Sequence, residues 1–261
     1  MKLKLYCFHG GSLVCDKNAI TLGRGLGTPY EVPIPYFLID HPKGKVLYDT
    51  GMALGVALDK RKHWGAVCDV YDPKMKEDEF VVNNLAKIGV KADDIKFVIQ
   101  SHLHLDHAGG LGCFPNAKYV VQQEELRWAY APQFYQAGAY IKQDIFKPIN
   151  WLVLRGTLDD NYDLFGDGTV RIWFSPGHTP GHQNVVVETE HNGTIVLTGD
   201  SCYTTEILDE DVLPGLVWNC EATVTSIARL RHAKNMCDYK IITGHDPENW
   251  VSVRKAPEFY D

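Results

Sequence analysis

Short runs of apolar and β-branched residues recur along the chain, and glycine, proline or a polar turn closes each run. Such runs are typical of strands buried on one or both faces of a sheet. They predict strands over 2–8, 36–40, 45–49, 95–100, 118–122, 170–174, 184–188, 194–198 and 240–243. The turn His41-Pro42-Lys43-Gly44 predicts a hairpin between the second and third of these strands.

Apolar residues at helical spacing predict three helices, over 77–88, 124–130 and 221–236. The apolar faces comprise Phe80, Val81, Leu85 and Ile88 in the first helix and Val224, Ile227, Ala228 and Leu230 in the third. Because the second half of the chain repeats the order of elements in the first and no linker separates them, we expect one domain over 1–261 with two similar halves.

Two segments, 52–76 and 131–168, have no clear period. Long irregular connections are often functional, and we expect loops and short helices in the second segment that cover a site. Large apolar residues in and beside these segments are candidates for a substrate pocket, although core packing is the simpler role for any one of them. The candidates are Trp64, Val67, Trp128, Phe134 and Tyr140.

The charge and cysteine patterns narrow the class of partner. The formal net charge is −7, and no run of five or more Lys or Arg is present. We therefore expect neither a nucleic-acid partner nor binding to an anionic membrane surface, and no apolar run approaches the roughly 20 residues of a membrane span. The N-terminus alternates like a strand, so we expect no secretory signal. Seven cysteines without a C-x-x-C pair favour free thiols in a reducing cytoplasm.

The densest chemistry lies directly after the predicted strand 95–100. His102, His104, Asp106 and His107 fall within six positions and are followed by Gly109-Gly110, which would free the backbone. His102 and His104 point to the same side of an extended segment, whereas the next two side chains follow after the chain begins to turn. Since packing gives no reason for four ligating side chains at this spacing, the segment predicts a metal-binding loop.

Three later strands carry further ligand types just beyond their ends, namely His178, Asp200 and His245. Together with the first loop they complete two metal sites. One would comprise His102, His104 and His178, and the other Asp106, His107 and His245, with Asp200 bridging. Nitrogen-rich ligation with a few carboxylates and no thiolate suits Zn²⁺, and Co, Mn or Fe fit the same ligands.

Three neighbouring residues have roles that the sequence leaves open. His182 follows His178 by four positions, so either could be the ligand; we favour His178 and assign His182 a supporting hydrogen bond. We expect Asp49, at the end of a strand, to orient a ligand histidine, and the alternative is a solvated turn residue. For Cys202, beside Asp200, the role of a small buried residue is simpler than that of a ligand or nucleophile.

The motif H-x-H-x-D-H, a Gly-His loop, a Gly-Asp strand end and a terminal Gly-His together resemble the metallo-β-lactamase superfamily over most of the chain. Within it, the segments 101–110, 199–203 and 243–246 resemble the N-acyl homoserine lactonases. Further similarity to the γ-butyrolactone lactonase branch lies in 36–39, 63–65, 166–169 and 255–260. The resemblance implies an α/β fold, a four-layer αβ/βα sandwich with the metals at one edge.

The activity that this resemblance implies is hydrolysis of the ester bond of a lactone by two divalent metals. The substrate would be an N-acyl homoserine lactone, γ-butyrolactone or both, in quorum quenching or lactone catabolism. Tyr203 matches the family's substrate-contacting tyrosine and would help to polarise the carbonyl, a contribution of roughly 3–4 kcal/mol per well-placed donor. Asp106 would pass a proton to the leaving alkoxide. Relatives also suggest a homodimer.

Other branches of the superfamily fit less well. Zinc β-lactamases of the common class have Cys where Asp200 stands, and flavin-linked diiron reductases have Glu where His104 stands. RNA-processing members usually carry additional recognition elements. Two alternatives stay open: a thioesterase of the glyoxalase II kind, which shares the ligand set, and a non-catalytic metal-binding protein.

Overall fold

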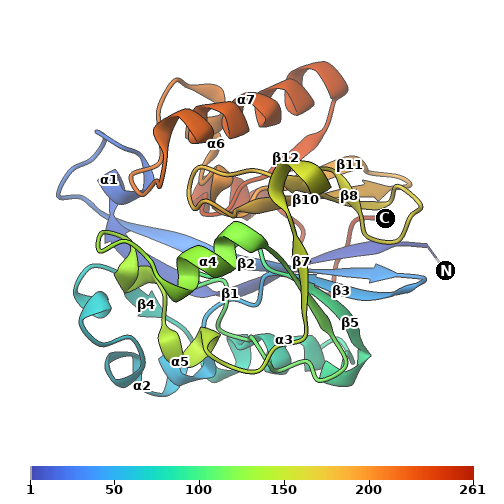
Figure 1. The fold of residues 1–261 in the computed structure, drawn as a ribbon, viewed down its shortest axis with the longest axis horizontal. Coiled ribbons are helices and arrows are strands. Elements are labelled where there is room, and N and C mark those ends of the chain that lie inside the picture. Colours follow the sequence, from blue (N-terminus) through green and yellow to red (C-terminus); the bar gives the residue numbers. More distant parts are fainter. Residues whose placement is uncertain (1) are drawn as a thin grey trace.

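The computed structural model describes residues 2–261. Two sheets pack face to face, and helices cover the outer face of each, which gives four layers (Figure 1). The first part of the chain forms a seven-stranded sheet in the order β4-β1-β2-β3-β5-β6-β7, and the second part forms a five-stranded sheet in the order β12-β11-β10-β9-β8. The αβ/βα sandwich expected from the sequence is confirmed.

The larger sheet comprises β1 Lys4–Asp16, β2 Pro29–His41, β3 Gly44–Tyr48, β4 Asp72–Lys74, β5 Ile95–Ile99, β6 Lys118–Gln122 and β7 Trp151–Leu154. The smaller sheet comprises β8 Tyr162–Asp163, β9 Val170–Phe174, β10 Gln183–Thr189, β11 Gly193–Leu197 and β12 Lys240–Ile242. The helices are α1 Lys17–Ile20, α2 Leu54–Trp64, α3 Val81–Ala86, α4 Gln123–Tyr130, α5 Lys142–Ile145, α6 Thr205–Asp209, α7 Cys220–Cys237 and α8 Pro247–Ser252.

Strand direction brings several strand ends to one edge of the sandwich. In the larger sheet β3, β5, β6 and β7 pair in parallel. In the smaller sheet β10 runs antiparallel to both β9 and β11, and β11 is parallel to β12, so β9, β11 and β12 share one direction. The loops that follow β5, β9, β11 and β12 therefore carry the predicted ligands from strands that end together.

The alternation of apolar residues explains the layers. In β10, Val185 and Val187 pack with residues of both sheets in the central core, whereas Val186 packs with the outer core that contains residues of α6 and α7. A third cluster joins the other face of the larger sheet to α3 and α4. Successive residues of a strand point to opposite faces, so one strand supplies two cores.

The irregular segments contain more structure than their sequences predict. Segment 52–76 forms α2, a 3-10 turn over Gly65–Asp69 and β4, and segment 131–168 includes β7 and β8 besides the expected short helices. Helix α2 was not predicted because its sequence has no continuous apolar face. Asp59 has a non-helical backbone, with φ −159°, and Leu58 faces solvent.

Two of the predicted helices differ in detail. The first begins as a 3-10 turn, Glu77–Glu79, and only then becomes α3. In α7 the buried face is set by Ile227, Leu230 and Ala233. Val224 is 56% exposed and Ala228 is also exposed, so their assignment to the apolar face is wrong. Within residues 2–261, the structure contains no helix of the length and apolarity that crossing a membrane requires.

Candidate metal centre and active site

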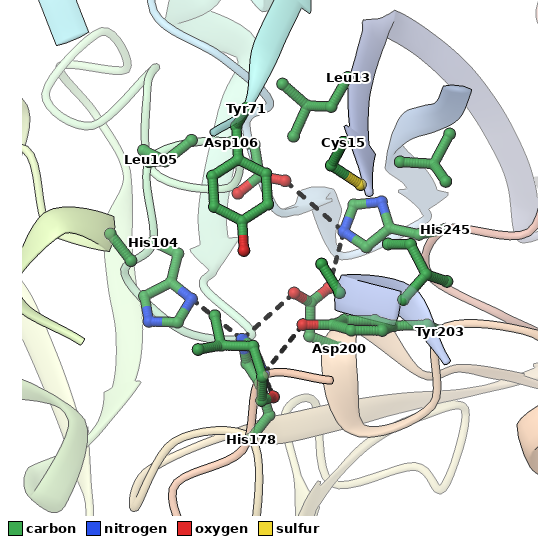
Figure 2. Close-up of a pocket in the computed structure, with 15 residues that line it drawn as sticks. Leu13, Cys15, Tyr71, His104, Leu105, Asp106, His178, Asp200, Tyr203 and His245 are labelled. Carbon is green, nitrogen blue, oxygen red and sulfur yellow. Dashed lines mark hydrogen bonds and ion pairs between the residues drawn. The ribbon is translucent and has the colours of Figure 1, made fainter. Parts of the chain in front are cut away.

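The predicted ligands meet at one edge of the sandwich, and all seven are buried. The segment after β5 brings His102, His104, Asp106 and His107, while the loops after β9, β11 and β12 bring His178, Asp200 and His245. Figure 2 shows His104 and His178 on one side of Asp200, with Asp106 and His245 on the other. Their side chains separate into two groups of ligand atoms that share this edge.

The first group, the three-histidine group, comprises His102, His104 and His178. The Nε2 atom of His178 lies 3.2 Å from Nε2 of His102 and 2.9 Å from Nδ1 of His104. Four atoms, namely one nitrogen from each of these histidines and one oxygen of Asp200, lie within 4.8 Å of one another. The Oδ2 atom of Asp200 lies 3.2 Å from His178 Nε2.

The second group, the Asp106 group, comprises Asp106, His107 and His245, whose ligand atoms also fall within 4.8 Å of one another. The other oxygen of Asp200, Oδ1, lies 3.1 Å from Nε2 of His107 and 3.1 Å from Nε2 of His245. Asp200 thus presents Oδ2 to the three-histidine group and Oδ1 to the Asp106 group. A carboxylate that bridged two cations would need this position.

Hydrogen bonds on the outer side of two imidazoles determine which nitrogen faces inward. Nδ1 of His178 lies 3.0 Å from the Leu216 carbonyl oxygen, and Nδ1 of His245 lies 2.9 Å from that of Pro33. A carbonyl only accepts, so each Nδ1 carries a proton, and Nε2 is the nitrogen that can offer a lone pair to a cation in its group. The Oδ1 atom of Asp200 is also buried without an aligned hydrogen-bond donor. Inward lone pairs and an unpaired carboxylate oxygen fit a divalent cation in each group.

Asp49 orients two further histidines. Its φ of 60° turns the chain at the end of β3, where its carboxylate is buried. Oδ2 accepts from Nδ1 of His107 at 2.9 Å and from the Ser101 hydroxyl at 2.7 Å, and Oδ1 accepts from the Ser101 backbone N–H at 2.7 Å. The Ser101 oxygen in turn lies 2.9 Å from Nδ1 of His102. One carboxylate therefore fixes a histidine in each group.

The remaining predicted supporting histidine lies outside both groups. Nε2 of His182 accepts the backbone N–H of Asp200 at 3.0 Å. This contact holds Asp200 at the start of its loop. Cys202 is buried, its thiol donates to the Thr204 carbonyl oxygen, and burial raises the pKa of this thiol to about 12. A thiol that stays protonated and faces a carbonyl is neither a nucleophile nor a ligand.

Charge is concentrated around the carboxylate of Asp200. Burial holds the pKa of His102 and His104 well below the usual range, and their histidine neighbours add to this effect. At His107 burial has the same tendency, but Asp200, Asp106 and Asp49 outweigh it and raise the pKa well above its ordinary value. Those carboxylates attract positive charge, which divalent cations would supply.

Tyr203 and five of the predicted ligands, His104, Asp106, His178, Asp200 and His245, face a cavity of about 50 Å³ (Figure 2). The Tyr203 hydroxyl oxygen lies 3.2 Å from Nδ1 of His178. Because that nitrogen gives its proton towards Leu216, Tyr203 keeps its own proton for a molecule in the cavity. Burial raises the pKa of Tyr203 well above its usual value, so the hydroxyl stays protonated. The other walls are Leu13, Cys15, Ala19, Ile20, Val32, Tyr71, Leu105, Ala139 and Leu216.

The five pocket candidates from the sequence are absent from that lining. Trp64 is buried in the core, and Val67 packs against the same core. Trp128 donates to Gln136, and Phe134 is 89% exposed. Tyr140 comes nearest to the site, since its ring packs edge-on against His104 with centroids 4.7 Å apart. Their part in a larger substrate pocket stays a prediction.

Two residues that the sequence did not single out belong to the site. The ring of Tyr71 stands over the cavity with its hydroxyl directed towards the ligands (Figure 2). Ser101 relays Asp49 to His102. Tyr71 contributes through contacts with residues that are distant in sequence. Ser101 contributes through its hydrogen bond to Asp49, so its role is recognised only once the position of Asp49 is known. No local pattern identifies either residue.

Gly109 and Gly110 serve the loop differently from expectation. Neither has a positive φ. A Cβ on Gly109 would lie 2.0 Å from the Ala53 nitrogen, and one on Gly110 would lie 2.8 Å from Cβ of Thr50. The glycines therefore permit close approach of the ligand loop to the segment after β3, rather than an unusual backbone conformation.

Comparison with known proteins agrees with this geometry. The family model of the metallo-beta-lactamase superfamily matches residues 29–245. The N-acyl homoserine lactonase AttM of Azorhizobium caulinodans is 45% identical over 260 residues, covering 99% of each chain. AiiA, the N-acyl homoserine lactonase of Bacillus thuringiensis subsp. kurstaki, is 32% identical over 257 residues, covering 98% of each.

A solved structure of an N-acyl homoserine lactone hydrolase, with the product N-hexanoyl-L-homoserine at its catalytic metal centre, superposes with a TM-score of 0.89. It is 31% identical, and the match covers 99% of this chain and 100% of that one. The full-length similarity and the shared fold lead to one conclusion: the chain belongs to the metallo-β-lactamase superfamily and, within it, to the N-acyl homoserine lactonase family.

Proposed function

We propose that this metal-dependent hydrolase opens the ester bond of N-acyl homoserine lactones, γ-butyrolactone or both, and releases the hydroxy acid. The observation that carries the proposal is the position of Asp200 between two ligand groups, with the Tyr203 hydroxyl over the same cavity. The lactonase names of relatives at 45% and 43% identity support this substrate class.

The donor set is proposed to hold two Zn²⁺ ions, and Co, Mn or Fe would accept the same nitrogen and oxygen ligands. The three-histidine group would hold one ion, the Asp106 group the other, and Asp200 would contact both. When bound, such cations supply Lewis acidity towards a carbonyl and activate water near neutral pH.

The chain's own residues would position the ester and handle its charge. Tyr203 directs a protonated hydroxyl into the cavity and can donate to the lactone carbonyl oxygen as negative charge develops there. Asp106 lines the same cavity opposite Tyr203 and is the carboxylate available to move a proton to the departing ring oxygen. The apolar wall would receive the carbon chain of the substrate and exclude water from it.

The setting of the protein is part of the proposal. All seven cysteines are free, which agrees with a reducing cytoplasm. The partner would be a small lactone, with neither nucleic acid nor membrane involved, and the chain would act as a homodimer. Light scattering of the purified protein would test the dimer independently of activity.

A comparison of substrates tests the activity. Rates would be measured by pH-stat on γ-butyrolactone, on homoserine lactones with short and long acyl chains, and on a glutathione thioester. We expect the lactones to be hydrolysed with the highest kcat/KM. Faster hydrolysis of the thioester would favour the glyoxalase II alternative, and two bound metals without any hydrolysis would favour a non-catalytic role.

A further inference from the structure

Glu125 is a buried carboxylate that neither ligand group includes. It lies in the first turn of α4, its side chain is fully buried, and it does not line the cavity. Oε1 accepts the backbone N–H of Leu103 at 2.9 Å and the hydroxyl of Tyr140 at 3.0 Å. Oε2 accepts the hydroxyl of Thr179 at 2.5 Å.

Each of these donors belongs to the surroundings of the three-histidine group. Leu103 lies between His102 and His104, and Thr179 directly follows His178. The ring of Tyr140 packs edge-on against His104. Glu125 thereby connects the loop after β5 with the loop after β9, although these loops are about 75 residues apart in sequence.

The loop after β9 is built to reach Glu125. A Cβ on Gly181 would lie 2.1 Å from the Glu125 backbone nitrogen, so only glycine lets the loop lie against the start of α4. Burial raises the pKa of Glu125, and hydrogen bonds from Thr179, Leu103, Tyr140 and Gly181 oppose that rise. A buried carboxylate is costly even when hydrogen-bonded, and an apolar side chain of similar volume would fill the space at a lower cost.

The Asp106 group depends on other contacts. His107 is held by Asp49, and His245 by the carbonyl oxygen of Pro33. We propose that Glu125 is a positioning residue that sets the spacing of His102, His104 and His178, and so determines metal affinity at the three-histidine group but not at the Asp106 group. This inference rests on the proposed two-metal centre.

The test is a metal titration of the Glu125→Gln protein. The amide nitrogen must face either the Leu103 N–H or the Thr179 and Gly181 side, so one buried donor loses its acceptor. Metal-free wild-type and variant proteins are titrated with Zn²⁺ against a chromophoric chelator, which yields two dissociation constants. We expect one constant to rise by roughly 10–100-fold, as for outer-shell partners of ligands, and the other to stay unchanged.

A matched control separates positioning from loss of stability. Asp144 in α5 is also a buried carboxylate, but it pairs with His63 and contacts no ligand loop. Asp144→Asn should keep both dissociation constants of the wild-type protein, even if its melting temperature falls. Thr179→Val removes one contact to Glu125 and provides a milder second variant that should weaken the same site.

The outcomes are distinct. If the wild-type protein binds fewer than two ions, the proposed function fails. If it binds two, and Glu125→Gln and Thr179→Val match the Asp144→Asn control or weaken both sites equally, the inference about Glu125 is overturned. The visible spectrum of the Co²⁺ protein adds a second readout. If Glu125→Gln changes only the geometry of the three-histidine group, the absorption bands of the ion in that group should shift, and those of the ion in the Asp106 group should stay unchanged.

Discussion

Replacement of Asp49 by Asn tests how the protein prepares a ligand before metal arrives. Oδ2 accepts from His107 and from the Ser101 hydroxyl, and Oδ1 accepts from the Ser101 backbone N–H. An asparagine can place its oxygen at only one of these positions. Its NH₂ group must therefore face an N–H, either that of Ser101 or that of His107.

The structure sets the size of the effect. Leaving one buried donor without an acceptor costs about 1–3 kcal/mol, which corresponds to roughly 5–150-fold in a binding constant. In the metal-free protein His107 can relieve the conflict by losing its Nδ1 proton and keeping the proton on Nε2, which faces Asp200. Metal binding needs the Nε2 lone pair, so the conflict returns on binding and the cost appears in the affinity of the Asp106 group.

Zinc competition titration measures this cost directly. We expect Asp49→Asn to weaken the Asp106 group within that range, while the melting temperature of the metal-free protein changes little. Asp144→Asn, the same chemical change at a carboxylate that contacts no ligand loop, should keep wild-type affinity. Unchanged zinc affinity in Asp49→Asn would refute the role of Asp49 in orienting His107.

Three further predictions concern the reaction, the packing and the thiols. Tyr203→Phe should lower kcat on a lactone by about 10–100-fold with little change in KM, because bound metal would still polarise the carbonyl; an unchanged kcat would remove Tyr203 from the reaction. Gly109→Ala should lower the melting temperature by several degrees, whereas Gly138→Ala, whose Cβ would meet only Val67 at 3.7 Å, should not. Iodoacetamide at pH 8 should modify exposed Cys220 in the folded protein but not Cys202, as mass spectrometry would show.

The strands next to the site could be predicted from sequence because their patterns are local. The bounds of β6 and β9 agree with the predicted 118–122 and 170–174, where clustered β-branched and aromatic residues stand between turns. By contrast β7 is a four-residue strand at the edge of its sheet, with Val153 40% exposed. Its short and partly solvated sequence has little to distinguish it from a loop.

The candidate site likewise contains residues that local patterns predict and residues that only the fold brings together. Candidate ligands such as His102 and Asp200 could be named because chemistry and spacing coincide within a few residues or at a strand end. The cavity wall combines Leu13 from β1, Tyr71 and Leu216, which only the tertiary fold brings together. The role of Glu125 could not be predicted either, since in the sequence it resembles an ordinary polar residue at the start of a helix.

We propose that two metal ions, one in each group, make this chain a lactonase. The most direct measurement is lactone hydrolysis by metal-free protein as Zn²⁺ is added stepwise, with bound metal counted at each step. We expect activity to be absent without metal and to reach its maximum at two ions per chain. Full activity without metal, or no lactone hydrolysis with both groups filled, would contradict it.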